Sequence, residues 1–385
     1  MGARTITAGF LSALLACTGG AILVVQAAET AGLSKAELIS WLTSAYIAGG
    51  LLNLCLTLKY KIPFAGAHSI TAAAFLGTAA AGYSYPQLAG AFVMSGLFIL
   101  LAGCTGVFSK AVKVIPGQLI DALLAGLVLT YVLQLVPAGL SLPYSGLFAG
   151  AGFFLLPLLV KRIPPALGAL LFGLFGLAIE YRFPALPAPE FILPMPVMPQ
   201  FTMTGLLSLA IPMSLLILSN DLAVAMTSFK SNRFDPPVDK SLIASGAAGM
   251  AAGFFGGNAA NVGGLMSALC SSPESGPHQQ RYLAAALSSL IVIGFGAFAW
   301  RAVDIINVMP ASFIQLMTGF SLLGLFLKAL GRAFSNKPLF FPSILTFAVA
   351  ALHVSMFGIS TPIWALGAGI VLMKGLPPIR QIFIK

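Results

Sequence analysis

The chain has 385 residues, of which 58% are hydrophobic and only 8% are charged. A soluble globular domain has about 25% charged residues, so this composition excludes a soluble protein, and it also excludes a disordered chain. An outer-membrane barrel is excluded because its strands would alternate polar and apolar residues. The net charge of +10 does not indicate a nucleic-acid-binding protein, because the basic residues stand singly or in pairs between apolar runs. The sequence therefore predicts an all-α polytopic membrane protein.

Hydropathy and helix breakers predict fourteen transmembrane spans, seven on each side of a proline-rich linker. The first seven are expected at 6–28, 39–58, 62–80, 86–109, 116–136, 143–160 and 164–180. The second seven are expected at 202–228, 239–254, 256–272, 282–300, 310–331, 339–353 and 360–375. The expected organisation is a first repeat at 1–182, a linker at 183–200 and a second repeat at 201–385.

The basic residues divide unequally between the two sides of this map. If the N-terminus is inside, only Lys35, Arg182 and Arg301 of the 20 Lys and Arg residues lie outside. The other seventeen are Arg4, Lys59, Lys61, Lys110, Lys113, Lys161, Arg162, Lys230, Arg233, Lys240, Arg281, Lys328, Arg332, Lys337, Lys374, Arg380 and Lys385. This bias follows the positive-inside rule. It predicts a multi-pass protein of the bacterial inner membrane, with both termini in the cytoplasm.

The two halves have matching landmarks. An odd number of spans in each half means that the halves insert in opposite senses, which is typical of inverted repeats. A small-residue break near Gly66 precedes a helix-starting proline, Pro116, by 50 residues. A second break near Ala260 precedes Pro310 by 50 residues, and both pairs are offset by 194 residues. We therefore expect two inverted seven-span repeats.

The third and tenth spans begin with residues that form helices poorly. Residues 62–69 include Pro63, and residues 254–264 include four glycines and two asparagines. Each is expected to be a strand-like break followed by a half-helix, with the irregular backbone lining a cavity. Two half-helix N-termini would favour an anion. The alternative is that the glycines only permit close helix packing, as Gly249 and Gly253 suggest.

Two ionisable residues are expected to carry proton coupling, Asp221 and His68. Asp221 stands nine residues before Lys230, about 13 Å along a helix, which is close to the midplane. A carboxylate at that depth marks an ion or proton pathway, and a histidine can donate to a carboxylate or transfer a proton. The alternative for both residues is a structural, hydrogen-bonded role. Asp121 is expected to be structural, and Asp304 is expected in an outer loop.

The candidate substrate-binding residues lie at the two breaks and beside Asp221. They are Phe64, Gly66, Ala67, His68, Ser69, Asn220, Asn258, Ala260, Asn261 and Gly263. Three scattered histidines form no metal-binding pattern, and P-loop, nucleophile and dinucleotide motifs are absent. We therefore expect no enzyme activity, no catalytic residue, no metal and no cofactor.

The chain resembles the benzoate/proton symporter family (BenE type), a relative of the uracil-permease and sulfate-permease folds. The resemblance is carried by Gly9-Phe10, Gln26-Ala27-Ala28, 58–63, Leu269-Cys270-Ser271-Ser272-Pro273-Glu274, 280–286, 310–315 and Gly319. It implies a core domain of spans 1–4 and 8–11 and a gate domain of spans 5–7 and 12–14. It also implies a substrate held between the half-helices, uptake coupled to protons, and a homodimer.

The sequence departs from the family pattern at the site itself. The family usually has Thr-Ala-Trp-Ser-Thr-Pro-Gly where 66–72 reads Gly-Ala-His-Ser-Ile-Thr-Ala, and a glycine where this chain has Asn261. The family's Ser-Gln-Asn is Ser219-Asn220-Asp221 here. The leading hypothesis is a proton-coupled symporter that imports a small organic anion, benzoate or a similar aromatic carboxylate. The alternatives are a transporter of an uncharged solute such as a nucleobase, and an anion channel.

Overall fold

The computed structural model describes residues 2–106, 116–160, 164–188, 190–335, 337–354, 356 and 361–375. Six of the predicted inner charges lie outside the described residues: Lys110, Lys113, Lys161, Arg162, Arg380 and Lys385. Residues 107–109 of the predicted fourth span and residue 360 of the fourteenth also lie outside them.

The described chain is helical in both halves. The first half has α1 (Ala3–Leu15), η1 (Ala16–Gly20), α2 (Ala21–Thr30), α3 (Lys35–Tyr60), α4 (Ile70–Ala79), α5 (Tyr85–Thr105), α7 (Gly117–Leu133), α8 (Leu135–Ser141), α9 (Pro143–Phe154), α10 (Leu156–Leu159) and α11 (Pro165–Glu180). The second half has α12 (Met203–Gly205), η2 (Leu206–Ala210), α13 (Ile211–Leu216), η3 (Ile217–Leu222), α14 (Ala223–Ser231), α15 (Val238–Gly253), α16 (Gly264–Ser271), η4 (Pro273–Ser275), η5 (His278–Gln280), α17 (Arg281–Ala297), α18 (Ala299–Asn307), α19 (Ala311–Ala333), η6 (Lys337–Leu339), α20 (Phe340–Ala351) and α21 (Thr361–Gly375). The turns η1, η2 and η3 are π-helical.

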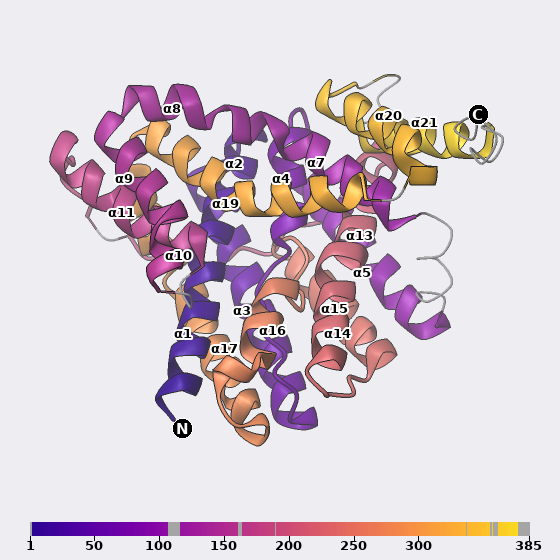
Figure 1. Ribbon diagram of the computed structural model, residues 1–385, viewed down its shortest axis with the longest axis horizontal. Coiled ribbons are helices and arrows are strands. Elements are labelled where there is room, and N and C mark those ends of the chain that lie inside the picture. The colour runs from indigo at the N-terminus through magenta and orange to yellow at the C-terminus, as the bar shows by residue number, and fades with distance from the viewer. Residues whose placement is uncertain are drawn as a thin grey trace.

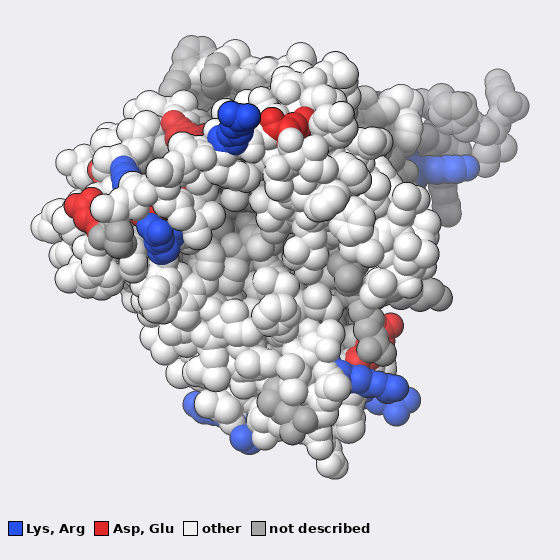
Figure 2. Space-filling view, turned by 90° about the vertical axis from the view of Figure 1, so that its left-hand side faces the viewer, with Lys and Arg blue, Asp and Glu red and all other residues white. Residues whose placement is uncertain are grey.

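Seven helical segments in the described part of the chain are long and apolar enough to cross a bilayer. They are Ala3–Thr30, Lys35–Tyr60, Tyr85–Thr105, Gly117–Ser141, Met203–Ser231, His278–Ala297 and Ala311–Ala333. Shorter apolar helices cover Ile70–Ala79, Pro143–Leu159, Pro165–Glu180, Lys337–Ala351 and Thr361–Lys374. Figure 2 shows charged side chains near the two ends of one face and an uncharged band between them. The predicted all-helical membrane protein is confirmed.

Local sequence signals explain where several helices begin. Ser34 and Glu37 form a capping box at the start of α3, with the Ser34 N–H donating to Glu37 Oε2 at 2.7 Å. Pro116 and Pro310 are the N-cap residues of α7 and α19, as expected for helix-starting prolines. Proline is tolerated there because its missing N–H would have no partner in the first helical turn.

The helices pack into two groups that meet near the middle of the molecule. One group contains α1 to α5 and α12 to α18, in which α5 packs on α15 and α17 packs on both α1 and α3. The other contains α7 to α11 and α19 to α21, in which α7 packs on α19 and α20 and α9 packs on α11. Figure 1 shows α8, α19 and α20 in its upper part and α14, α16 and α17 in its lower part.

Close helix packing through glycine occurs in α15. A Cβ at Gly246 would meet the backbone of Leu100 and Gly96 in α5, and one at Gly253 would meet Val93. The small-residue packing that was the alternative explanation for the second break therefore operates in α15. The break itself begins after this helix and has a different geometry.

One predicted position is wrong. Asp304 was expected in an outer loop, but it lies in α18 and is only 1% exposed. Its carboxylate is 2.5 Å from Lys35 Nζ and 3.6 Å from an Arg301 nitrogen. Two neighbouring cations make this burial tolerable, because a paired carboxylate loses much less on leaving water than an isolated one.

Candidate functional site

The two predicted breaks are extended and pair with each other. The Asn261 N–H donates to the Ala67 carbonyl at 2.9 Å, and the Gly263 N–H donates to the Ala65 carbonyl at 3.0 Å. His68 and Ala260 form an antiparallel bridge between them. The pairing satisfies backbone groups that would otherwise be costly in the interior of a membrane protein. The expected strand-like breaks are therefore present in the structure.

A short helix follows each break. Ser69 is the N-cap of α4, and its Oγ accepts a hydrogen bond from the Ala72 N–H at 3.1 Å. Gly263 is the N-cap of α16. Both helices therefore begin next to the same pair of extended segments. Helix N-termini carry unpaired N–H groups and a positive dipole end, so this arrangement favours a negative charge.

Asp221 is bonded to the start of α4. Its Oδ2 accepts hydrogen bonds from Ser69 Oγ and, at 3.1 Å, from Thr71 Oγ1. The side chain stands in the π-helical turn η3, a distortion often found at functional sites, and the residue is 7% exposed. Hydroxyl groups, rather than backbone N–H groups, thus hold the carboxylate in place.

His68 is held by both of its ring nitrogens. Nε2 lies 3.2 Å from the Tyr46 hydroxyl, and Nδ1 lies 3.2 Å from the Ser69 carbonyl oxygen. The Tyr46 hydroxyl also donates to the Ala16 carbonyl at 2.6 Å. Among the described residues, no hydrogen bond joins His68 directly to Asp221; Ser69 lies between them and contacts both.

Buried asparagines leave polar atoms without partners beside the paired segments. Asn258 Oδ1 accepts from Trp41 Nε1 at 2.9 Å, but its Nδ2 has no hydrogen-bond partner among the described residues. Neither Asn261 Nδ2 nor Oδ1 has a partner of normal geometry, although this amide lies near the Asp221 carboxylate. Asn53 Oδ1 is also unpaired in the described structure. A buried polar group without a partner costs about 1–3 kcal/mol, so several together indicate a site for a polar ligand or water.

The remaining predicted site residues form the frame of the site. A Cβ at Gly66 would collide with the backbone of Asn261 and Gly263, so the close approach of the segments requires glycine there. Ala67 and Ala260 contribute through the backbone pairing described above. The Phe64 ring is fully buried and packs edge-to-face on Phe229 at 4.9 Å between centroids.

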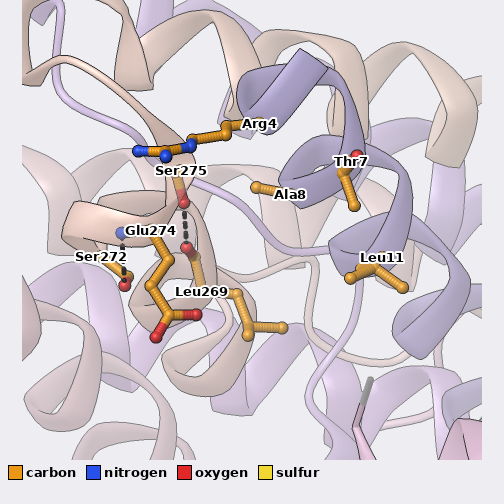
Figure 3. Close-up of a pocket in the computed structure, with 8 residues that line it drawn as sticks. All are labelled: Arg4, Thr7, Ala8, Leu11, Leu269, Ser272, Glu274 and Ser275. Carbon is orange, nitrogen blue, oxygen red and sulfur yellow. Dashed lines mark hydrogen bonds between the residues drawn. The ribbon is translucent and has the colours of Figure 1, made fainter. Parts of the chain in front are cut away.

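The site is closed in this structure. All predicted substrate-binding residues are buried, and the polar residue among them with the largest exposed fraction, Asn220, is 8% exposed. A cavity of about 40 Å³ lies elsewhere, between the start of α1 and the segment after α16 (Figure 3). It is lined by Arg4, Thr7, Ala8, Leu11, Leu269, Ser272, Glu274 and Ser275. None of the predicted substrate-binding residues lines this cavity.

The sequence alone did not identify five side chains at the site: Trp41, Tyr46, Asn53, Thr71 and Arg332. Asn53 is a polar residue within the apolar span 39–58, and this contrast could have identified it, whereas Trp41 and Tyr46 are aromatic residues that do not contrast with their span. Thr71 had no sequence feature that marked it as a site residue, apart from its position two residues after Ser69. Arg332, counted among the inner charges, has its Nη2 2.6 Å from Asp121 Oδ1 and 3.3 Å from Asn220 Oδ1. No local pattern could have predicted that contact.

A family model described as benzoate membrane transport protein (BenE) matches residues 1–374. The chain belongs to the BenE family. It is 30% identical over 371 residues to the inner membrane protein YdcO of Escherichia coli (strain K12), covering 95% of this chain and 94% of YdcO. It is 25% identical over 371 residues to the benzoate membrane transport protein of Acinetobacter baylyi, covering 94% and 93%. The resemblance inferred from the sequence motifs is confirmed.

The fold of this BenE protein is also similar to a solved structure. The transmembrane domain of a cyanobacterium bicarbonate transporter, BicA, superimposes with a TM-score of 0.62 and 15% identity. The match covers 96% of this chain and 97% of that domain, and it shows a shared fold. Together, the family and these relatives identify the BenE chain as a membrane transport protein and not an enzyme.

Proposed function

We propose that this protein is a secondary active symporter that imports benzoate, or a similar small aromatic carboxylate, together with protons. The observation that carries the proposal is the meeting of two half-helix N-termini around a buried carboxylate, Asp221, with unpaired asparagine amides beside them. The names of the family and of the Acinetobacter relative support benzoate as the substrate.

The substrate carboxylate would lie between the starts of α4 and α16. A helix dipole stabilises a nearby negative charge by about 0.3–1 kcal/mol at an exposed site and up to ~2 kcal/mol when partly buried. The Asn258 and Asn261 amide nitrogens are donors without an acceptor in the described structure, so a bound carboxylate would pair them. His68, Ser69 and the backbone at Gly66 complete the proposed binding residues.

Asp221 would carry the coupled proton. Ser69 contacts both Asp221 and His68, and so links the two residues proposed for proton coupling. A deprotonated Asp221 repels a carboxylate bound beside it, and this repulsion is strong where the dielectric constant is low. Protonation removes the repulsion, so a proton and the anion bind with positive coupling. This coupling is the physical basis of symport in our proposal.

Transport would proceed by movement of the two helix groups. We propose that α1 to α5 with α12 to α18 form the core domain, and that α7 to α11 with α19 to α21 form the gate domain. The arrangement would be fourteen spans in two inverted repeats, supported by the matching N-cap prolines Pro116 and Pro310. The protein would reside in a bacterial inner membrane as a homodimer, with both termini in the cytoplasm. The name of the Escherichia coli relative supports that membrane.

The decisive experiment is uptake of radiolabelled benzoate into proteoliposomes of the purified protein, with and without an inward proton gradient. We expect gradient-driven accumulation that an uncoupler abolishes. Absence of benzoate uptake by protein shown to be folded would contradict the proposed substrate. Large currents without accumulation would instead identify an anion channel.

A second candidate function is transport of an uncharged solute such as a nucleobase. The unpaired atoms of Asn258 and Asn261 include both donors and an acceptor, and an uncharged heterocycle would satisfy them as well as a carboxylate. Competition between benzoate and uracil in the same uptake assay separates the two candidates. Inhibition by uracil but not by benzoate would favour the second.

A further inference from the structure

Arg332 contacts both helix groups at one point. It stands near the end of α19, and its Nη2 is 2.6 Å from Asp121 Oδ1 in α7, within the same group. The same nitrogen is 3.3 Å from Asn220 Oδ1 in η3, which belongs to the other group. Asn220 directly precedes Asp221. One guanidinium therefore connects α7 and α19 to the turn that holds the proposed proton carrier.

The two contacts differ in strength. The Asp121 side chain is 13% exposed and that of Arg332 is 49% exposed, so a cation partly in solvent reaches inward to a mostly buried carboxylate. Gln118 Nε2 in α7 also donates to Ser335 Oγ just beyond α19, at 3.3 Å. These bonds fix Arg332 to its own group. The longer contact to the neutral amide of Asn220 is the weaker of the two and is the one that can break when the groups move.

A carboxylate can take the place of Asn220 on Arg332. Hydrogen bonds between ionised groups are roughly twice as strong as neutral ones, and the planar guanidinium matches a carboxylate with two parallel N–H groups. Within the described part of the chain, no other Lys or Arg side chain hydrogen-bonds a predicted substrate-binding residue. An anion that left the site past Asn220 would meet this cation, because the guanidinium contacts the Asn220 side chain.

We propose that Arg332, positioned by Asp121, is a specificity-determining residue of transport: it closes the site at Asn220 and receives the substrate carboxylate when that contact opens. The inference rests on the proposed function, because it requires an anionic substrate. Its closing role, however, is tested without any transport assay.

The first test measures access to the site. Thr71→Cys places a thiol beside Asp221 in a background in which Cys17, Cys55, Cys104 and Cys270 are replaced by alanine. We expect Arg332→Gln to raise the rate of labelling by a small methanethiosulfonate reagent at least fivefold in folded, purified protein. Lys328→Gln removes an exposed charge one turn earlier on α19 and should leave the rate unchanged. Equal rates in all three proteins would overturn the closing role, whatever the substrate is.

The second test measures charge selection. Arg332→Gln should raise the half-saturating benzoate concentration about tenfold, the effect of losing one charge-assisted hydrogen bond, and Arg332→Lys should restore part of the loss. The preference for benzoate over uncharged benzamide in competition should fall in Arg332→Gln. An unchanged preference with intact uptake would overturn the specificity role. Failure of the wild-type protein to take up benzoate would count against the proposed function, while the labelling result would still decide the closing role.

Discussion

The Ser69 hydroxyl joins Asp221 to the first turn of α4, because it donates to the Asp221 carboxylate while it accepts the Ala72 N–H. A protonated Asp221 becomes a hydrogen-bond donor, and the Ser69 hydroxyl must then rearrange. Ser69 is the N-cap of α4. The gain or loss of a proton at Asp221 therefore alters the hydrogen bonds at the end of α4 that faces the proposed substrate. This contact gives proton coupling a direct structural route.

Asp221→Asn should separate coupling from binding. The amide cannot gain or lose the proton, so gradient-driven benzoate accumulation should fall at least tenfold while benzoate counterflow continues. Uptake and counterflow in proteoliposomes measure the two activities. Asp235→Asn, at an exposed loop position, is the matched control and should behave as wild type. Full accumulation in Asp221→Asn would remove Asp221 from proton coupling.

Ser69→Ala should reduce both stability and transport. Loss of an N-cap costs about 0.5–2 kcal/mol, and Asp221 would keep only Thr71 as a partner. Thermal unfolding in detergent and benzoate affinity are the measurements. Ser34→Ala removes the N-cap of α3 outside the site and should lower Tm with no change in affinity. If Ser69→Ala bound benzoate as tightly as Ser34→Ala, its hydroxyl would be a helix cap only.

Asn261→Ala should weaken binding without destabilising the fold. Its amide atoms make no hydrogen bond of normal geometry among the described residues, and the neighbouring Asp221 carboxylate keeps its bonds to Ser69 and Thr71 when the amide is removed. We expect an unchanged or higher Tm and at least a tenfold loss of benzoate affinity. Asn53→Ala is the contrasting variant, because Asn53 Nδ2 donates to the Gly49 and Asn261 carbonyls at 2.8 and 2.9 Å. It should destabilise the protein by about 1–3 kcal/mol. A large loss of stability in Asn261→Ala would indicate a structural amide.

Gly66→Ala should disrupt the paired segments. The added Cβ would overlap the backbone of Asn261 and Gly263, and a backbone held by hydrogen bonds on both sides cannot shift as a side chain does. Overpacking of this kind costs about 1–3 kcal/mol. We expect a lower Tm and loss of uptake. Gly150→Ala in α9, where a Cβ would meet nothing within 4 Å, should leave both unchanged. Normal uptake by Gly66→Ala would contradict the close approach of the two segments.

The membrane class, the breaks and the short helices after them were predictable because their causes are local. Proline, glycine and asparagine weaken a helix wherever they stand, so the extended segments at 62–69 and 257–263 follow from composition over a few residues. The same holds for the starts of α7 and α19 at Pro116 and Pro310. The boundaries were less accurate: the predicted span 116–136 continues to Ser141, because Pro137, just after its expected end, lies in the first turn of α8, where proline is tolerated.

The contacts that make the site depend on residues far apart in the chain, and only the folded structure determines them. Asp221 meets Ser69 across 152 positions, and Arg332 meets Asn220 across 112. Hydropathy describes how a residue partitions between water and lipid, but it does not say which side chain faces it across a helix interface. Arg332 was therefore placed only among the inner charges, although its guanidinium contacts Asp121 and Asn220, and Asp304 was placed in a loop, although it is buried against Lys35 of another helix. Residue types set what each segment can form, and packing between helices that are far apart in the chain decides which polar atoms meet.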